Sequence, residues 1–135
     1  MVLLNKIFIK VEPKTSANYE VERKKELRDK IRAKIDNLLD LQKACKGKRL
    51  SIYACFCLWD GSKVEGRAKK DLDNMLKILC DTLKEYMDTD KKEQGLGLIE
   101  NDNDDLIFEI NCSKRLVQTE SEEGIELEIS EFPQQ

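Results

Sequence analysis

The spacing of apolar residues changes several times along the chain, and each change marks the border of a predicted element. Residues 2–11 alternate between apolar and polar positions, which predicts a strand that ends at Pro13. From about residue 19 to residue 45, apolar side chains recur every three or four positions, as in an amphipathic helix, and Gly47 is a suitable stop. The first third of the chain therefore predicts a strand followed by a helix.

The longest apolar run, Leu50–Trp59, follows that helix. A run of this length with few polar positions is typical of an interior strand that is covered on both faces. After a polar loop over residues 60–70, the helical spacing returns from about residue 72 to residue 87. Residues 88–98 are mostly polar and contain glycine, so they predict an exposed insertion.

Two more strands are predicted in the last third of the chain. Residues 106–112 have strand character, and residues 125–129 alternate apolar and acidic side chains as an edge strand does. The predicted order is β-α-β-α-β-β, an α+β fold with two helices packed on one mixed sheet. A length of 135 residues suits a single domain that covers residues 1–135.

Composition narrows the possible chemistry, because the chain contains no histidine. This absence excludes an imidazole base or nucleophile, a histidine-bound zinc, and the usual Ser-His and Cys-His catalytic pairs. Any acid-base or metal chemistry must therefore depend on Asp, Glu, Lys, Cys or Tyr.

The five cysteines are odd in number and form no Cys-x-x-Cys motif. We expect them to be reduced and packed as small apolar side chains rather than to bind metal. No apolar run approaches the ~20 residues of a membrane span, and the first residues lack the pattern of a signal peptide. Together these features predict a soluble cytoplasmic protein.

Charge is divided unevenly between the two halves of the chain. Residues 1–70 carry 18 Lys and Arg against 9 Asp and Glu, whereas residues 71–135 carry 6 against 18. A chain polarised in this way can place a basic surface beside an acidic site.

The sharpest local feature is a pair of aspartates where the predicted loop enters the second helix. Asp71 is placed to cap this helix and Asp73 lies in its first turn, while Lys77 follows one turn later on the same face. A second acidic cluster, residues 102–105, precedes the next strand, and we expect it to return near the helix start. Ordinary helix capping is the alternative explanation for the first pair.

Converging carboxylates need a cation between them. Each pair at 4 Å would repel by ~4 kcal/mol, and a hard divalent cation removes that penalty. Oxygen-only ligands favour Mg²⁺ or Mn²⁺, which in such sites activate water for phosphodiester hydrolysis. A calcium-binding EF-hand is not supported, because Asp88-x-Asp90 and Asp102-x-Asp104 lack the Gly and Glu that its loop requires.

Basic residues lead directly into the first aspartate. With the acidic site they suit a substrate that has a polyphosphate backbone, and we expect four of them to bind the phosphates that flank the one being cut: Lys63, Arg67, Lys69 and Lys70. A second basic patch precedes the longest apolar run: Lys43, Lys46, Lys48 and Arg49. Solvated surface charge is the alternative explanation for both groups.

These residues resemble the RusA family of Holliday junction resolvases. The segment Asp71-Leu72-Asp73-Asn74-Met75-Leu76-Lys77 matches the Asp-x-Asp-Asn-x-x-Lys signature of that family. Residues 97–100 look like the approach to its second acidic motif, and residues 107–114 look like the strand after it. The resemblance covers roughly residues 50–131, and the stretch between the two motifs is longer here.

The resemblance implies a RusA-like homodimer that uses Mg²⁺, or Mn²⁺, to resolve four-way DNA junctions by paired incisions during recombination and repair. Asp71, Asp73 and Asp104 would be catalytic metal ligands, and Lys77 would contact the scissile phosphate. For the third ligand, counting back from the following strand gives Asp104 and counting forward from residue 97 gives Asp102. Strand register favours Asp104, because loops absorb insertions more readily than strands do.

Two other classes of function remain. One is a non-catalytic junction-binding or DNA-binding module of the same fold, against which the joint presence of Asp71, Asp73 and Lys77 argues. The other is a different metal-dependent phosphohydrolase that acts on nucleotides. The chain lacks the Gly-rich phosphate loops that such enzymes often use.

Overall fold

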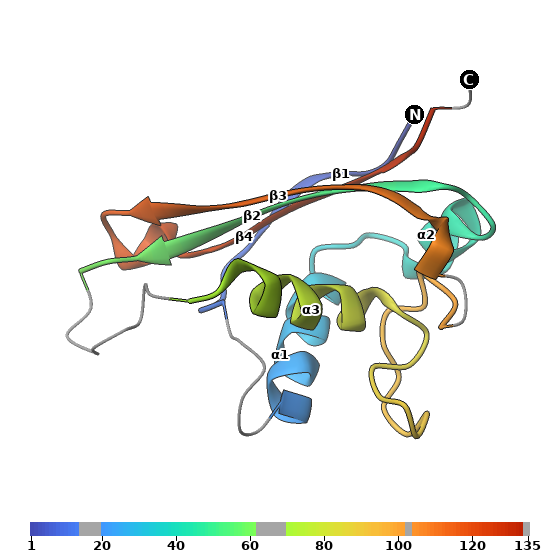
Figure 1. Ribbon diagram of the computed structural model, residues 1–135, viewed down its shortest axis with the longest axis horizontal. Helices are drawn as coiled ribbons and strands as arrows, with labels where there is room; N and C mark the ends of the chain where they lie inside the picture. The colour runs from blue at the N-terminus through green and yellow to red at the C-terminus, as the bar shows by residue number, and fades with distance from the viewer. Residues whose placement is uncertain (14–19, 62–69, 102–103, 134–135) are drawn as a thin grey trace.

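The computed structural model describes residues 1–13, 20–61, 70–101 and 104–133, with only the backbone of Asp104 (Figure 1). Its centre is a four-stranded sheet in the order β1-β4-β2-β3. The strands are β1 (Val2–Ile9), β2 (Leu50–Trp59), β3 (Ile107–Val117) and β4 (Gly124–Glu131). β4 pairs antiparallel with both β1 and β2, and β2 pairs parallel with β3. The sheet is therefore mixed.

Helices cover one face of this sheet. They are α1 (Glu20–Arg32), α2 (Leu38–Cys45) and α3 (Leu72–Leu83), and the short 3₁₀ helices η1 (Asp104–Leu106) and η2 (Glu120–Glu122) precede β3 and β4. Figure 1 shows α1 and α3 side by side beneath the strands. The predicted α+β architecture is confirmed. No helix in the described ranges has the length and apolar character needed to cross a membrane.

The core lies between the helices and the face of β2 that carries its even-numbered residues. Ile52, Ala54, Phe56 and Leu58 are almost completely buried there. Side chains from all three helices join them in one cluster: Leu27, Ile31, Leu41, Cys45, Met75, Ile78, Leu79 and Leu83. The apolar spacing of the helical segments thus identifies the residues that pack on the sheet.

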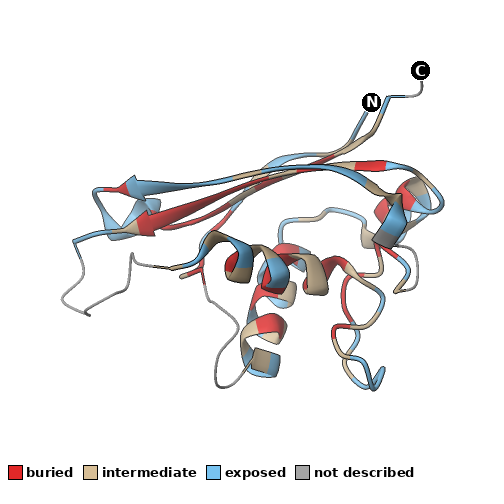
Figure 2. Cartoon of the chain, in the orientation of Figure 1, coloured by how far each residue is buried: buried red, intermediate tan, exposed pale blue. Residues whose placement is uncertain are grey.

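On the other face of β2, which no described helix covers, part of the side chains are buried by the neighbouring strand. Cys55 and Cys57 are buried and form a small cluster with Val117 of β3. Figure 2 shows β2 mostly buried, whereas the neighbouring β3 is mostly exposed. The prediction of an interior strand is therefore confirmed for β2, although helices cover only one of its faces.

The first predicted helix is broken into α1 and α2. After α1, the N–H groups of Lys34 and Ile35 donate to carbonyls only three residues back, which tightens and ends the helix. Asn37 then caps α2, because its side chain accepts a hydrogen bond from the Asp40 N–H at 3.1 Å. The apolar spacing continues across this cap, so periodicity alone did not reveal the break.

The second predicted helix ends earlier than expected, at Leu83. The segment after it folds back onto the end of α3: the Leu96 N–H donates to the Thr82 carbonyl at 2.8 Å and the Leu98 N–H to the Leu83 carbonyl at 2.9 Å. Leu96 and Leu98 are buried in the core. The predicted exposed insertion over residues 88–98 is therefore wrong for its second half.

The last strand is not at the edge of the sheet. β4 lies between β1 and β2, so the prediction of an edge strand is wrong. Its acidic residues face the side of the sheet without helices, where the Glu126 carboxylate accepts a hydrogen bond from the Tyr53 hydroxyl at 3.1 Å. Alternation of apolar and acidic residues thus indicates that one face of the strand is uncovered. An interior strand can have such a face as well as an edge strand.

A buried ion pair joins α1 to α3. Lys24 has 7% of its surface exposed, and its Nζ lies 2.9 Å from Asp81 Oδ2 and 3.7 Å from Glu20 Oε1. The same ammonium donates to the Met87 carbonyl at 3.3 Å. Because a buried charge has lost most of its water, these oxygen partners replace its hydration. The pair fixes α1 against the last turn of α3.

Replacing Lys24 with Ala should lower the free energy of unfolding by about 2 kcal/mol, because Asp81 then keeps only the 3.6 Å contact with Lys84. Lys25→Ala is the matched control: Lys25 is 43% exposed beside Glu93, and its loss should cost about 0.5 kcal/mol or less. Urea denaturation measures both values. The double variant Lys24→Met/Asp81→Leu should recover much of the loss, and equal costs for the two single variants would contradict a buried pair.

Candidate functional site

The start of α3 carries the two aspartates that the sequence predicts as metal ligands. Asp71 is the N-cap by backbone position, because its carbonyl accepts the Met75 N–H at 3.2 Å. Its side chain makes no capping hydrogen bond and instead accepts one from Asn74 Nδ2 at 3.4 Å. The residue is exposed. Ordinary helix capping therefore does not account for the Asp71 carboxylate.

Asp73 lies in the first turn of α3 and is also exposed. Met75 and Leu79 of the same helix are buried, so Asp73 lies on the solvent side. Among the described residues, no hydrogen bond or ion pair holds its carboxylate. The positive end of the helix dipole favours both negative charges. The start of α3 therefore offers anionic oxygen ligands that the fold itself does not use.

Lys77, one turn further along α3, contacts α1 rather than Asp73. Its Nζ lies 3.9 Å from Glu20 Oε1, and its side chain is 61% exposed. Lys77 and Glu20 border a cavity of about 530 Å³ that also includes Lys24 and Asp81. An ion pair this exposed contributes well under about 1 kcal/mol. The lysine is therefore held only weakly on the α1 side.

The third predicted ligand lies at the other end of α3. Because β2 and β3 are parallel, α3 must run back along the sheet from the end of β2 to the start of β3. Lys114, near the end of β3, donates to the Lys70 carbonyl at 3.0 Å, which places the entry to α3 at that end. The backbone of Asp104 lies in η1, at the opposite end (Figure 1). The 12 residues of α3 span ~18 Å.

The expectation that the acidic loop returns to the start of α3 is therefore wrong for Asp104 within one chain. Asn101, the last described residue before it, also lies at the far end: its side chain exchanges hydrogen bonds of 2.8 and 3.0 Å with the backbone of Tyr86. Asp102 and the side chain of Asp104 lie outside the described residues. In the part of the chain that is described, no three acidic or cysteine side chains form a group that could hold a metal ion.

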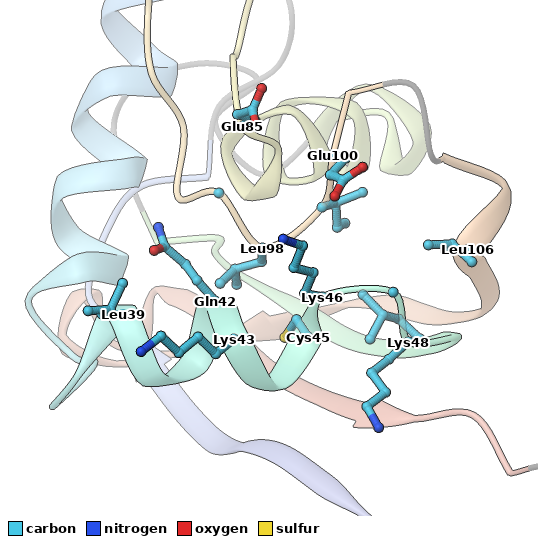
Figure 3. Close-up of a pocket in the computed structure, with 14 residues that line it drawn as sticks. Leu39, Gln42, Lys43, Cys45, Lys46, Lys48, Glu85, Leu98, Glu100 and Leu106 are labelled. Carbon is cyan, nitrogen blue, oxygen red and sulfur yellow. The ribbon is translucent and has the colours of Figure 1, made fainter.

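A second cavity of about 310 Å³ lies next to η1. Three lysines from the end of α2 and the loop after it line this cavity: Lys43, Lys46 and Lys48. In Figure 3, Lys46 extends toward the segment that carries Glu100, while Lys48 points away from it. Glu85 lies on the same side as Glu100. The second predicted basic patch therefore lies beside Asp104 and not beside Asp71.

One residue expected to bind DNA, and one residue of the second basic patch, have other contacts. Lys70 has a side chain that is only 12% exposed, and its Nζ lies 2.9 Å from Glu12 Oε2 and donates to the Pro13 carbonyl at 2.5 Å. In this structure the charge of Lys70 ties the entry of α3 to the segment after β1, and its contact with a phosphate stays a prediction. Arg49 lies 5.1 Å above the Phe108 ring. Three further candidates lie outside the described residues: Lys63, Arg67 and Lys69.

Two lysines that organise this region were not predicted. Lys24 falls three positions before the buried Leu27 on the apolar stripe of α1, and a lysine in such a stripe signals a buried counterion. Lys114 had no signal in the sequence, because its contact with the Lys70 carbonyl depends on the pairing of β3 with β2.

No disulfide joins the five cysteines, and three of them are buried: Cys45, Cys55 and Cys57. Burial raises the pKa of the Cys45 thiol to about 11. Burial, and secondarily the neighbouring Cys55, raises the pKa of Cys57 to about 11. Both thiols are therefore protonated at neutral pH, which suits small apolar side chains rather than nucleophiles.

These two thiols should make stability depend on pH in the alkaline range. Their pKa in the folded protein lies above the ordinary value of 9.0, so their stabilising effect is complete below pH 9 and is lost as the pH rises to about 11. We expect Tm, measured by calorimetry, to fall over this range. It should fall less steeply in Cys45→Ala/Cys57→Ala, which keeps every Lys and Tyr. Equal slopes would show that the buried thiols do not titrate there.

No family model, curated protein or solved structure matches this chain. The resemblance to the RusA family therefore depends on the residues of the chain alone.

Proposed function

We propose that this protein is a metal-dependent endodeoxyribonuclease that resolves four-way (Holliday) DNA junctions, as its resemblance to the RusA family implies. The observation that carries the proposal is the start of α3, where Asp71 and Asp73 are exposed and neither side chain caps the helix. These two residues, with Asn74 and Lys77, occupy every fixed position of the family signature. A helix that needed only a cap would not require this set.

The donor set at this site suits Mg²⁺ or Mn²⁺. Asp71 and Asp73 supply carboxylate oxygens, which are the ligands that hard divalent cations prefer. Such a cation, when bound, neutralises charge on a phosphate and makes water a better nucleophile. We assign Asp71 and Asp73 to holding it. Lys77, which is held only weakly by Glu20, would turn its ammonium toward a phosphate oxygen.

If Asp104 is the third ligand, it must come from a second subunit. Within one chain the helix α3 separates it from Asp71 and Asp73, because a parallel crossover puts them at opposite ends of the sheet. In a two-fold symmetric dimer, the start of β3 in one subunit can meet the end of β3 in the other. Two equivalent composite sites would then suit paired incisions in a two-fold symmetric junction.

The cavity beside η1, which three lysines and two glutamates line, would add positive charge for a polyanionic substrate. In such a composite site, the subunit that supplies Asp104 would also bring Lys43 and Lys46 close to the scissile phosphate. Lysines at this place would bind the neighbouring phosphates of the DNA strand, which fixes the position of the duplex without reading its sequence.

Asp73→Asn should abolish cleavage of a synthetic four-way junction in Mg²⁺ while binding survives, and Asp71→Asn should do the same. Each change removes an anionic metal ligand, keeps the shape of the side chain, and lowers repulsion with the DNA. Asp90→Asn, at an exposed position after α3, is the matched control and should leave the rate unchanged. Cleavage gels with junction and linear duplex, together with gel-shift assays, measure both properties.

Near wild-type cleavage by Asp73→Asn would show that the catalytic assignment is wrong. A wild-type protein that binds the junction but does not cut it with Mg²⁺ or Mn²⁺ would instead favour a non-catalytic DNA-binding module.

Mixing two inactive variants tests whether the third ligand comes from the partner. Asp73→Asn and Asp104→Asn should each be inactive, yet a heterodimer of the two contains one intact composite site and one site with both substitutions. We expect junction nicking to return after the variants are mixed and subunits exchange. If all ligands came from the same chain, every site would carry one substitution and no activity would return. Repeating the mixture with Asp102→Asn identifies which aspartate acts.

A further inference from the structure

The outer edge of β3 is a long and regular strand edge. No other described strand pairs with it, since β3 is the last strand of the sheet and pairs only with β2. Three large apolar side chains on this strand are exposed: Phe108 (49%), Ile110 (42%) and Leu116 (61%). Figure 2 shows the strand mostly in the colour of exposed residues. An exposed edge with these properties is a template for pairing with another strand.

The opposite edge of the sheet does not have this character. The pairing of β1 with β4 shifts register between Val2 and Leu4 and again between Leu4 and Ile7. Such irregularities twist an edge strand and hinder its pairing with a further chain. β3, in contrast, pairs with β2 without interruption from Glu109 to Val117. The β3 edge is therefore the one that remains open to another strand.

We propose that β3 pairs antiparallel with β3 of a second copy of this chain, around a two-fold axis through Cys112. Residues directly opposite in an antiparallel pair project from the same face, and a two-fold axis normal to the sheet keeps equivalent faces together. Because side chains alternate between the two faces along a strand, a residue and the residue opposite it in the second copy must differ by an even number of positions. The axis must therefore lie where one residue is opposite its own copy, and not between two consecutive residues. Cys112 is the central residue of Ile107–Val117, so this position pairs the whole strand.

This register places unlike side chains opposite each other. Glu109 comes opposite Arg115 of the second copy, and the axis repeats that pair. Arg115 is 57% exposed, and among the described residues of its own chain it contacts Glu126 at 3.8 Å and donates a hydrogen bond to Cys57 Sγ. Ile110 comes opposite the long aliphatic stem of Lys114. Moving the axis by one residue separates Glu109 from Arg115, so charge complementarity also selects Cys112.

The same pairing would assemble the composite site, a consequence that rests on the proposed function. Antiparallel strands bring the start of β3 in one copy to the end of β3 in the other. The contact between Lys114 and the Lys70 carbonyl shows that the entry to α3 lies at that end. Asp104 of one copy would thus lie at the same end of the joined sheet as Asp71 and Asp73 of the other.

A disulfide across the axis tests the pairing directly. Opposite Cα atoms in antiparallel strands are ~4.5–5.5 Å apart, within the range of a disulfide. Mild oxidation of the wild-type protein should therefore give a covalent dimer on a non-reducing gel, and Cys112→Ser should remove it. Cys80→Ser, at a partly exposed position on α3, is the matched control and should keep it. A cross-link that survives Cys112→Ser, or none in the wild type, would overturn the proposal.

Charge reversal tests the register. Arg115→Glu should raise the dimer Kd about tenfold, because it places two like-charged pairs across the axis. The double variant Glu109→Arg/Arg115→Glu restores opposite charges and should return Kd close to the wild-type value. Lys92→Glu, exposed in the segment after α3, should leave Kd unchanged. Sedimentation equilibrium measures Kd, and a double variant as weak as Arg115→Glu would show that the register is wrong.

These measurements contain neither DNA nor metal, so they separate the interface from the activity. If the protein is monomeric, or forms a dimer without Cys112 at its centre, the proposed interface is wrong. This holds whether or not the protein cleaves four-way junctions. A dimer linked through Cys112 that never cleaves a junction would support the proposed interface and contradict the proposed nuclease activity.

Discussion

The parallel pairing of β2 with β3 is the constraint on which the rest of this structure depends. β2 is buried on both faces and lies between two strands, so its position determines the core. A parallel neighbour cannot be reached by a tight turn, and the chain must return along the whole length of the sheet. That return is α3, which covers the core with one side and presents Asp71 and Asp73 to solvent with the other.

Aspartates on α3 illustrate how the environment divides one residue type between structure and chemistry. Asp81 lies 2.9 Å from the buried Lys24, and that contact joins two helices. Asp71 and Asp73 lie about three and about two turns earlier. Both are exposed, and neither forms an ion pair among the described residues. A carboxylate that is already paired with a lysine binds a metal cation less readily than an unpaired one. The unneutralised pair is therefore the better candidate for a metal.

The sequence predicted those properties of the fold that depend on local spacing. The strand Leu50–Trp59, the start of α3 at Leu72 and the mixed sheet were all predictable, because burial imposes a periodicity on each element. The break at Asn37 was not, since the apolar spacing continues across it. The interior position of β4 was missed for a related reason: an uncovered face produces the same alternation as an uncovered edge.

Only the part of the candidate site that lies on α3 was predictable from the sequence. Asp71, Asp73 and Lys77 lie within two turns of one helix, so their relation follows from helical geometry. The places of Lys70 and Asp104 depend on contacts between distant segments, so local spacing did not reveal that Lys70 lies against Glu12 or that Asp104 lies at the far end of α3. In a parallel crossover, however, the residues just before the helix lie at the end of the first strand, and the residues just before the second strand lie at the opposite end of the sheet. If the proposed acidic motif converges on one metal, it would therefore do so between two chains. The strand that Asp104 precedes is also the one whose outer edge pairs with no other described strand.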